Sequence, residues 1–357
     1  VDNHWRFYVR PDGQVWHHTE ALPASARSLT LLALAHTYAA ADATANNDND
    51  NTNNGDGGGG GFSVLDYFDK AKAMAENLLA RRDASMKRFA ADDARFGMLE
   101  GADDAVHPQA PLSAVMNGDA PQSHWYASAA EAYRAFAELG RVWVAVGTAA
   151  KRADVVSHGA ALLQVAPKLR AQLHASLNRT VVHVDVPTAS ATGPSSSSSS
   201  PPPPSSSSQR CWAQMAEAAQ PSTPSFRGYA EMMYSGALDA QQIAEIYAAS
   251  SASACGPRLL VLGSPARSGS ALDMAAATGL AHGLLQADMA DEFLLHFLAT
   301  SAHAYTRGTH TAPESSDVID RDTATVAYSA AAEVAAPTYL KWMLCFEEPE
   351  TRTLWLA

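Results

Sequence analysis

Hydrophobic positions recur every three or four residues through much of the chain, which predicts a mainly helical protein. Leu65, Phe68, Ala71, Ala75 and Leu78 show this spacing clearly, and it is the period of one face of an α-helix. Alanine, the residue with the strongest helix preference, is abundant throughout. The same reasoning predicts helices at residues 24–41, 63–82, 128–139, 141–148, 155–177, 226–234, 240–250, 272–285, 290–303 and 337–346.

Segments with the character of β-strands are few, and we expect them at residues 7–9, 181–186 and 259–262. About ten helices joined by loops, without a repeat of fixed period, favour helical hairpins over a solenoid. The predicted fold is therefore mainly α, an incomplete α/α toroid in which residues 1–357 form a single domain.

Two tracts of low complexity interrupt the helical pattern. Residues 46–61 contain only Asn, Asp and Gly apart from Thr52, and residues 195–208 are serine around four prolines. Such segments bury too little apolar surface to fold, so we expect disordered insertions at about 46–61 and 190–210. Long insertions in surface loops cost little closure entropy, so neither tract has to mark a domain boundary.

Composition and charge exclude several classes of partner. The 357 residues are 47% hydrophobic and 17% charged, with a formal net charge of -12. No run of Lys and Arg could follow a phosphate backbone, so no nucleic acid partner is expected. No run of 18 apolar residues occurs, so no membrane span is expected. The spacing of Cys211, Cys255 and Cys345 predicts no disulfide framework and no zinc site, and we expect no cofactor. Composition says nothing about the oligomeric state.

The polar loop at residues 303–314 is the first candidate for chemistry. It ends a strongly apolar helical run and contains Tyr305, Arg307 and Glu314. A ring, a cation and a carboxylate are the groups that a sugar-binding cleft needs. Alternatively, Arg307 and Gly308 cap the end of the helix, and Pro313 prevents it from resuming. Spacing alone leaves both interpretations open.

Asp103 and Asp104 form a second candidate. With Glu100 they place three carboxylates within five residues, beside Gly97 and Gly101. Neighbouring like charges can raise the pKa of one carboxyl, as a general acid requires. The alternative is an acidic turn in which one aspartate caps the next element.

Trp125 and Tyr126 immediately precede a predicted helix and could form a stacking platform for a sugar face or could pack to fix the helix entry. Ser128 and Glu131 have the spacing of a capping box. We therefore interpret Glu131 as a cap partner rather than a catalyst.

Glu231 lies among apolar residues on a short predicted helix. A buried carboxylate without a partner is costly. We therefore expect Glu231 either to pair with Arg227 or to line a cavity.

Several longer stretches carry a resemblance to a known family: residues 7–13, 97–104, 126–140, 229–236, 303–314, 337–347 and 353–356. In these stretches the sequence resembles the six-hairpin glycosidases, whose catalytic domain is an α/α toroid. In relatives of that kind the last stretch leads into a β-rich domain, which we expect to be missing from this sequence.

The resemblance implies a glycoside hydrolase-like protein that hydrolyses or binds a saccharide at one end of the toroid. Hydrolysis would use two carboxyls flanking the bond, and the candidates are Asp103 or Asp104 with Glu314, and Glu231 in reserve. Trp125, Tyr126 and Tyr305 would stack against the sugar, and Arg307 would orient it.

Two alternatives are a polysaccharide lyase and a non-catalytic helical binding or scaffold protein. A lyase needs a Tyr or His base near a cation, which His124, Tyr126 and Arg307 could supply. The chain begins at Val1 and ends in apolar residues, so we interpret it as a fragment whose signal peptide, if any, is missing. Secretion is the expectation, because polysaccharides usually lie outside the cytoplasm.

Overall fold

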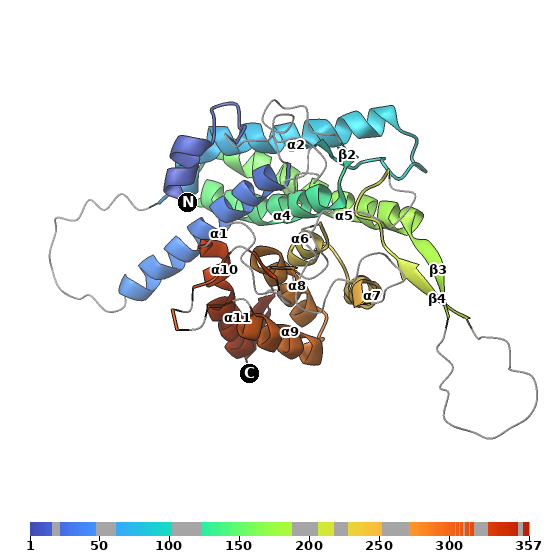
Figure 1. The fold of residues 1–357 in the computed structure, drawn as a ribbon. Helices are drawn as coiled ribbons and strands as arrows, with labels where there is room; N and C mark the ends of the chain where they lie inside the picture. Colours follow the sequence, from blue (N-terminus) through green and yellow to red (C-terminus); the bar gives the residue numbers. More distant parts are fainter. Residues whose placement is uncertain are drawn as a thin grey trace, which may run out of the picture. The chain divides into compact units, whose positions relative to one another are not determined.

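The structure is a computed structural model, and it is mainly helical, as predicted (Figure 1). Its described residues fall into two compact units. Unit 1 comprises residues 1–176, 215–217 and 235–237, and unit 2 comprises residues 177–214, 218–234 and 238–357. Within these spans the structure describes residues 1–15, 22–47, 62–101, 123–187, 206–217, 228–251, 271–303, 305–306, 308–309, 311–313, 315–317, 328–348 and 353–356.

Unit 1 is built mainly from long helices. Helix α1 packs against both α4 and α2. Two short strands pair antiparallel between α2 and α4, with Glu100 opposite His124 and Gly101 opposite Ser123. In chain order the elements are the π-helix η1 (His4–Tyr8), α1 (Leu22–Asn47), the 3-10 helix η2 (Val64–Tyr67), α2 (Phe68–Arg88), β1 (Glu100–Gly101), β2 (Ser123–His124), α4 (Tyr126–Ala149) and α5 (Ala153–Thr180), whose last residues belong to unit 2.

Helix α4 is one continuous helix, so the predicted break between residues 139 and 141 is wrong. Glycine is a poor helix former, but Gly140 is needed here for close packing against α5. A Cβ on Gly140 would lie 3.0 Å from the Gly159 carbonyl oxygen, and one on Gly159 would lie 2.8 Å from the Gly140 oxygen. Tertiary packing therefore explains Gly140, which we had interpreted from the sequence as a helix boundary.

Helix α4 begins two residues before the predicted capping box. Trp125 is its N-cap residue and makes no side-chain capping bond. Ser128 and Glu131 are both buried, and the Glu131 oxygens have no hydrogen-bond partner among the described residues. The prediction that Glu131 is a cap partner is therefore wrong.

The predicted strand at residues 7–9 is also wrong, because His4–Tyr8 form a π-helix. Of residues 7–9, Val9 alone makes an isolated β-bridge, to Val15. The Lys70 ammonium on α2 donates to the carbonyl oxygens of Trp5 (2.9 Å) and Val9 (2.7 Å). Hydrogen bonds from Lys70 to main-chain oxygens are therefore found where the sequence predicted strand pairing.

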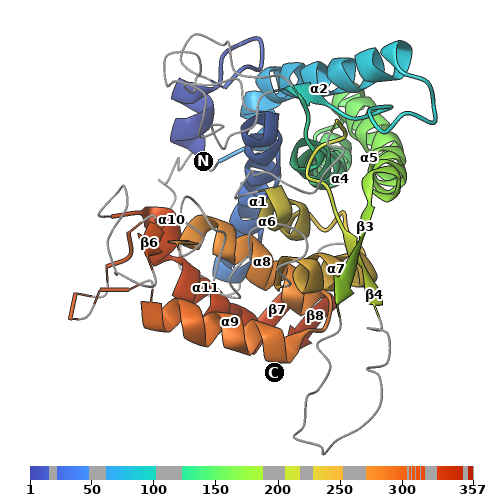
Figure 2. The same cartoon turned by 45° about the vertical axis from the view of Figure 1, so that its right-hand side comes forward.

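Unit 2 contains shorter helices (Figure 2). Its described strands form the antiparallel pairs β3–β4, β5–β6 and β7–β8, so among the described residues each strand has one partner. In chain order the elements are β3 (Val182–Pro187), β4 (Ser206–Cys211), α6 (Gly228–Tyr234), α7 (Ala240–Ser251), β5 (Ala271–Asp273), α8 (Met274–Gln286), α9 (Ala290–His303), β6 (Ser315–Asp317), α10 (Ala330–Glu333), α11 (Ala335–Leu344), β7 (Cys345–Glu348) and β8 (Thr353–Leu356).

The core of unit 2 lies among α8, α9 and α11. Leu284, Phe293 and Tyr339 are almost completely buried within it. Helix α6 packs closely on α8, where a Cβ on Gly279 would meet the Ala230 carbonyl oxygen at 2.3 Å. This contact holds α6, and with it Glu231, against the core.

Two sequence predictions need correction in the segment around β4. Ser206, Ser207 and Ser208 belong to this strand and pair with β3, so the end of the predicted serine-rich insertion is ordered structure. Cys211, the last residue of β4, is disulfide-bonded, although spacing predicted no disulfide framework. Cys345 is free. The predicted strand at residues 259–262 lies outside the described residues.

Within the described part of the chain, the search for membrane-spanning helices finds none that is both long and apolar enough.

Candidate functional site

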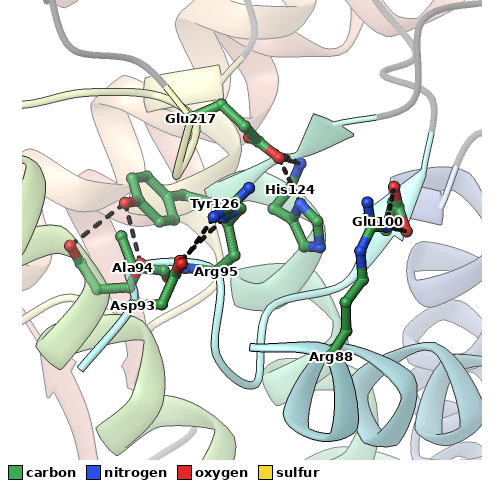
Figure 3. Close-up of polar contacts among 9 residues, drawn as sticks. Arg88, Asp93, Ala94, Arg95, Glu100, His124, Tyr126 and Glu217 are labelled. Carbon is green, nitrogen blue, oxygen red and sulfur yellow. Dashed lines mark hydrogen bonds and ion pairs between the residues drawn. The ribbon is translucent and has the colours of Figure 1, made fainter. Parts of the chain in front are cut away.

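A group of polar side chains in unit 1 gathers around the β1–β2 pair (Figure 3). Strand β2 places His124 directly before helix α4, and β1 places Glu100 opposite it. The turn after α2 contributes Asp93 and Arg95, and residues 215–217 return to the same unit with Glu217. Four separate stretches of chain therefore build the site.

His124 and Glu217 form its centre. Both Glu217 carboxylate oxygens lie 3.1 Å from the His124 backbone nitrogen, which donates to them. The His124 ring atom Nδ1 also bonds to Glu217 Oε1. The His124 ring is 2% exposed, so solvent contributes little to holding it. A single carboxylate thus fixes both the backbone and the ring of His124.

Glu217 is ionised at neutral pH. Burial by itself would raise its pKa, but hydrogen bonds from the His124 ring and backbone outweigh burial and lower the pKa below its ordinary value. A carboxylate on Nδ1 favours the tautomer with the proton on that nitrogen. The lone pair of the imidazole is then on Nε2, which is buried and has no hydrogen-bond partner among the described residues.

Phe89 connects the imidazole to two cations. Its ring meets the His124 ring edge to face, with 5.3 Å between centroids. The guanidinium carbons of Arg95 and Arg88 lie 4.1 and 5.0 Å from the Phe89 centroid. Cation–π contacts of this kind hold positive charge against an aromatic face. Both guanidinium groups and the imidazole therefore contact the same ring, that of Phe89.

Each of these cations is also paired with a carboxylate. Arg95 donates to both Asp93 oxygens, at 2.9 and 2.7 Å, and its backbone nitrogen donates to Oδ1 at 2.8 Å. These side-chain and backbone hydrogen bonds lower the pKa of Asp93 to about 2. Arg88 lies 3.3 Å from a Glu100 oxygen. The site therefore alternates positive and negative groups.

Tyr126 anchors the turn that carries Asp93 and Arg95. Its hydroxyl donates to the Ser176 carbonyl oxygen at 3.3 Å and accepts from the Ser176 hydroxyl at 3.0 Å. The Ser176 hydroxyl also bonds to the carbonyl oxygen of Ala94. Tyr126 is fully buried, so in this structure its role is to connect α4, α5 and the turn.

The arrangement has the parts of a general acid–base pair, and because Nε2 is buried, a substrate reaches it only if the surrounding side chains move. An imidazole with one nitrogen fixed by a carboxylate can accept a proton at the other nitrogen, and the carboxylate stabilises the imidazolium that forms. Among the described residues, no three His, Cys, Asp or Glu side chains lie close enough together to hold a metal ion.

Four of the predicted site residues lie outside the described residues: Asp103, Asp104, Arg307 and Glu314.

The other four predicted residues divide between the two units. In unit 1, Trp125 is 7% exposed and Tyr126 is fully buried, so neither ring offers a solvent-facing platform. In unit 2, Glu231 is 7% exposed on α6. Tyr305 is half-buried there, and its hydroxyl donates to the Ala332 carbonyl oxygen and accepts from the Ala336 nitrogen, both at 3.0 Å. The structure does not gather these four side chains in either unit, so their roles stay predictions.

Sequence reasoning identified His124 as a possible base but missed its partner. Glu217 lies 93 positions away, beyond the serine-rich tract, and no local motif marks it. Asp93 and Arg95 were missed because two adjacent opposite charges in a turn are common on surfaces. The one usable signal in the sequence was the aromatic residue Phe89, which has two cations nearby, Arg88 and Arg95.

The comparisons with known proteins assign no relative: no protein-family model, curated protein or solved structure matches the chain.

Proposed function

We propose that the chain is a saccharide-acting enzyme in which the His124 imidazole, held by Glu217, transfers the proton. The observation that carries this proposal is the buried His124–Glu217 pair with its unbonded Nε2. The saccharide substrate and the α/α toroid rest on the resemblance of the sequence to six-hairpin glycosidases.

The pair supports elimination from a uronic acid-containing saccharide better than hydrolysis. In this reaction Nε2 takes the proton from the carbon next to the carboxylate. The electrons of that carbon–hydrogen bond form a carbon–carbon double bond, and the glycosidic carbon–oxygen bond breaks. The leaving oxygen then takes up the proton from the His124 imidazolium, which restores the neutral base.

A cation must offset the charge that develops on the substrate carboxylate. The Arg88 and Arg95 guanidinium groups pack on Phe89. Either would supply that charge by exchanging its own partner, Glu100 or Asp93, for the substrate carboxylate.

Hydrolysis is the second candidate, because the carboxyls Asp103 and Asp104 lie two and three residues after strand β1 in the sequence. It requires two carboxyls on either side of the scissile bond. The discriminating feature is the product, since elimination leaves an unsaturated sugar that absorbs in the near ultraviolet and hydrolysis does not.

The test is to incubate the purified chain with neutral and uronate polysaccharides and to follow both reducing ends and ultraviolet absorbance. We expect His124→Asn to lower the rate by about 10²–10⁴-fold, the usual contribution of a general base. Asparagine keeps a donor for Glu217 but has nothing at the position of Nε2. The matched control is His183→Asn, which changes an exposed histidine on β3 and should leave the rate unchanged.

Full activity in a folded His124→Asn variant would exclude His124 as the base. In that case, loss of activity in Asp103→Asn or Asp104→Asn would point to carboxyl-catalysed hydrolysis. Retention of saccharides by a wild-type chain that cleaves none of them would indicate a binding protein.

A further inference from the structure

Unit 2 contains a cavity of about 620 Å³ bounded by α8, α9, α11 and the β7–β8 hairpin. Its walls include the rings of Phe293, Trp342, Phe346 and Trp355. Phe346 and Trp355 are directly opposed in the β7–β8 ladder, so their side chains lie on the same face of the hairpin. The rings of Trp342 and Phe346 meet edge to face, with 6.3 Å between centroids. Its size and aromatic walls are typical of a site for a small organic ligand.

Two polar groups in the lining restrict the chemistry of such a ligand. The side-chain oxygen Oε1 of Gln286 is buried and has no hydrogen-bond partner among the described residues. Asp288 adds a carboxylate at the turn between α8 and α9. Both groups accept hydrogen bonds, and the described residues of the cavity lining include neither Lys nor Arg. A ligand would complement them by donating a hydrogen bond or by carrying positive charge.

An anionic ligand is disfavoured on the same grounds. Moving an anion from water into an apolar cavity costs several kcal/mol unless a cation or several donors replace its hydration. Here the nearest charge in the lining is the Asp288 carboxylate, of the same sign. Aromatic faces, by contrast, attract cations and pack well on planar apolar bodies.

We propose that this cavity binds a small planar apolar molecule that is neutral or cationic and carries an N–H or O–H donor for Gln286. The site is independent of the proton-transfer chemistry proposed for unit 1, because every lining residue belongs to unit 2.

A matched pair of fluorescent probes tests the charge and shape of the site. N-phenyl-1-naphthylamine is neutral, has two flat aromatic ring systems and carries one N–H, and 8-anilinonaphthalene-1-sulfonate has the same aromatic body with a sulfonate added. We expect the neutral probe to bind the full chain with one saturable site and the sulfonate to bind about tenfold or more weakly, since it must lose hydration without gaining a cation.

Variants then place the probe in the cavity. Leu294→Trp, which enlarges a half-exposed side chain in the lining, should weaken binding of the neutral probe by about tenfold or more through steric filling. Leu298→Trp is the matched control, since Leu298 is 62% exposed one turn further along α9 and outside the lining. Gln286→Met, which removes the acceptor at similar volume, should weaken binding about fivefold, the effect of one hydrogen bond.

Equal affinity for the two probes would overturn the proposed ligand class. Equal weakening by Leu294→Trp and Leu298→Trp would place the probe on the exposed apolar surface of α9 instead of in the cavity. The proposal would also fail if probe binding fell as the protein was concentrated while the mass in sedimentation doubled, because a second copy of the chain would then occupy the site.

Discussion

At the scale of single residues, Glu131 shows how far burial can change a side chain. It lies in the middle of the buried face of α4 and is 1% exposed. Burial raises its pKa, and the nearby charges of Arg27 and Arg134 only partly oppose this effect. The folded protein therefore holds the Glu131 proton more tightly than the unfolded chain does.

This difference predicts a pH-dependent stability. Because its folded pKa is raised, Glu131 favours the folded state most below its ordinary value of 4.5, and this advantage is lost as the pH rises towards the folded pKa. Glu131→Gln should therefore gain stability over the wild type as the pH rises above about 4.5 and should keep that gain above the folded pKa, by about 1.4 kcal/mol for each unit of pKa shift. Thermal unfolding across this range measures it.

The control for this experiment is Glu76→Gln, which neutralises an exposed glutamate on α2. Its unfolding curve should follow the wild type at every pH within a few tenths of a kcal/mol. A constant difference between Glu131→Gln and the wild type across the pH range would contradict the argument.

At the scale of elements, the contact of α4 with α5 depends on two glycines that face each other. Gly140 and Gly159 bring the two helix backbones so close that either Cβ would lie within about 3 Å of a carbonyl oxygen across the interface. Helix propensity and packing oppose one another at these positions, and packing prevails.

Gly159→Ala should therefore destabilise the protein, although alanine is the better helix former. The added methyl would lie 2.8 Å from the Gly140 oxygen and 2.9 Å from the Val144 nitrogen, and overpacking against backbone costs about 1–3 kcal/mol. Chemical denaturation should show a lower unfolding free energy. Ser157→Ala, at an exposed position of the same helix, should be neutral or slightly stabilising, and an equal gain in both variants would refute the packing argument.

At the scale of the whole molecule, the disulfide at Cys211 ties the end of β4 to another part of the chain. Disulfides constrain the unfolded chain and persist in oxidising compartments. This bond agrees with the expectation of secretion, which remains a proposal.

Cys211→Ser should lower the unfolding free energy by about 2–5 kcal/mol, the usual contribution of a native disulfide. A reducing agent should lower the stability of the wild type by a similar amount and should have no further effect on the variant. Cys345→Ser is the control, since Cys345 is free. Equal unfolding midpoints for the wild type with and without reductant would show that the bond contributes nothing to stability.

Local patterns predicted the helices better than they predicted the site. The helix at residues 290–303 was predicted with the bounds that α9 has, because spacing and capping are properties of adjacent residues. The toroid is a relation between helices, so periodicity could only suggest it. Tyr126 was predicted to stack on a sugar, but spacing carries no information on burial, and the structure encloses it.

By itself, the sequence determined the mainly helical class, the positions of most helices and the candidate base His124, since each depends on residues close together in the chain. Only the tertiary structure decided that α4 runs through Gly140, that Glu131 is buried rather than capping, and that Glu217 orients the His124 ring. These last features depend on contacts between distant segments, and their energies come from packing and from the exclusion of water. No local pattern records such contacts.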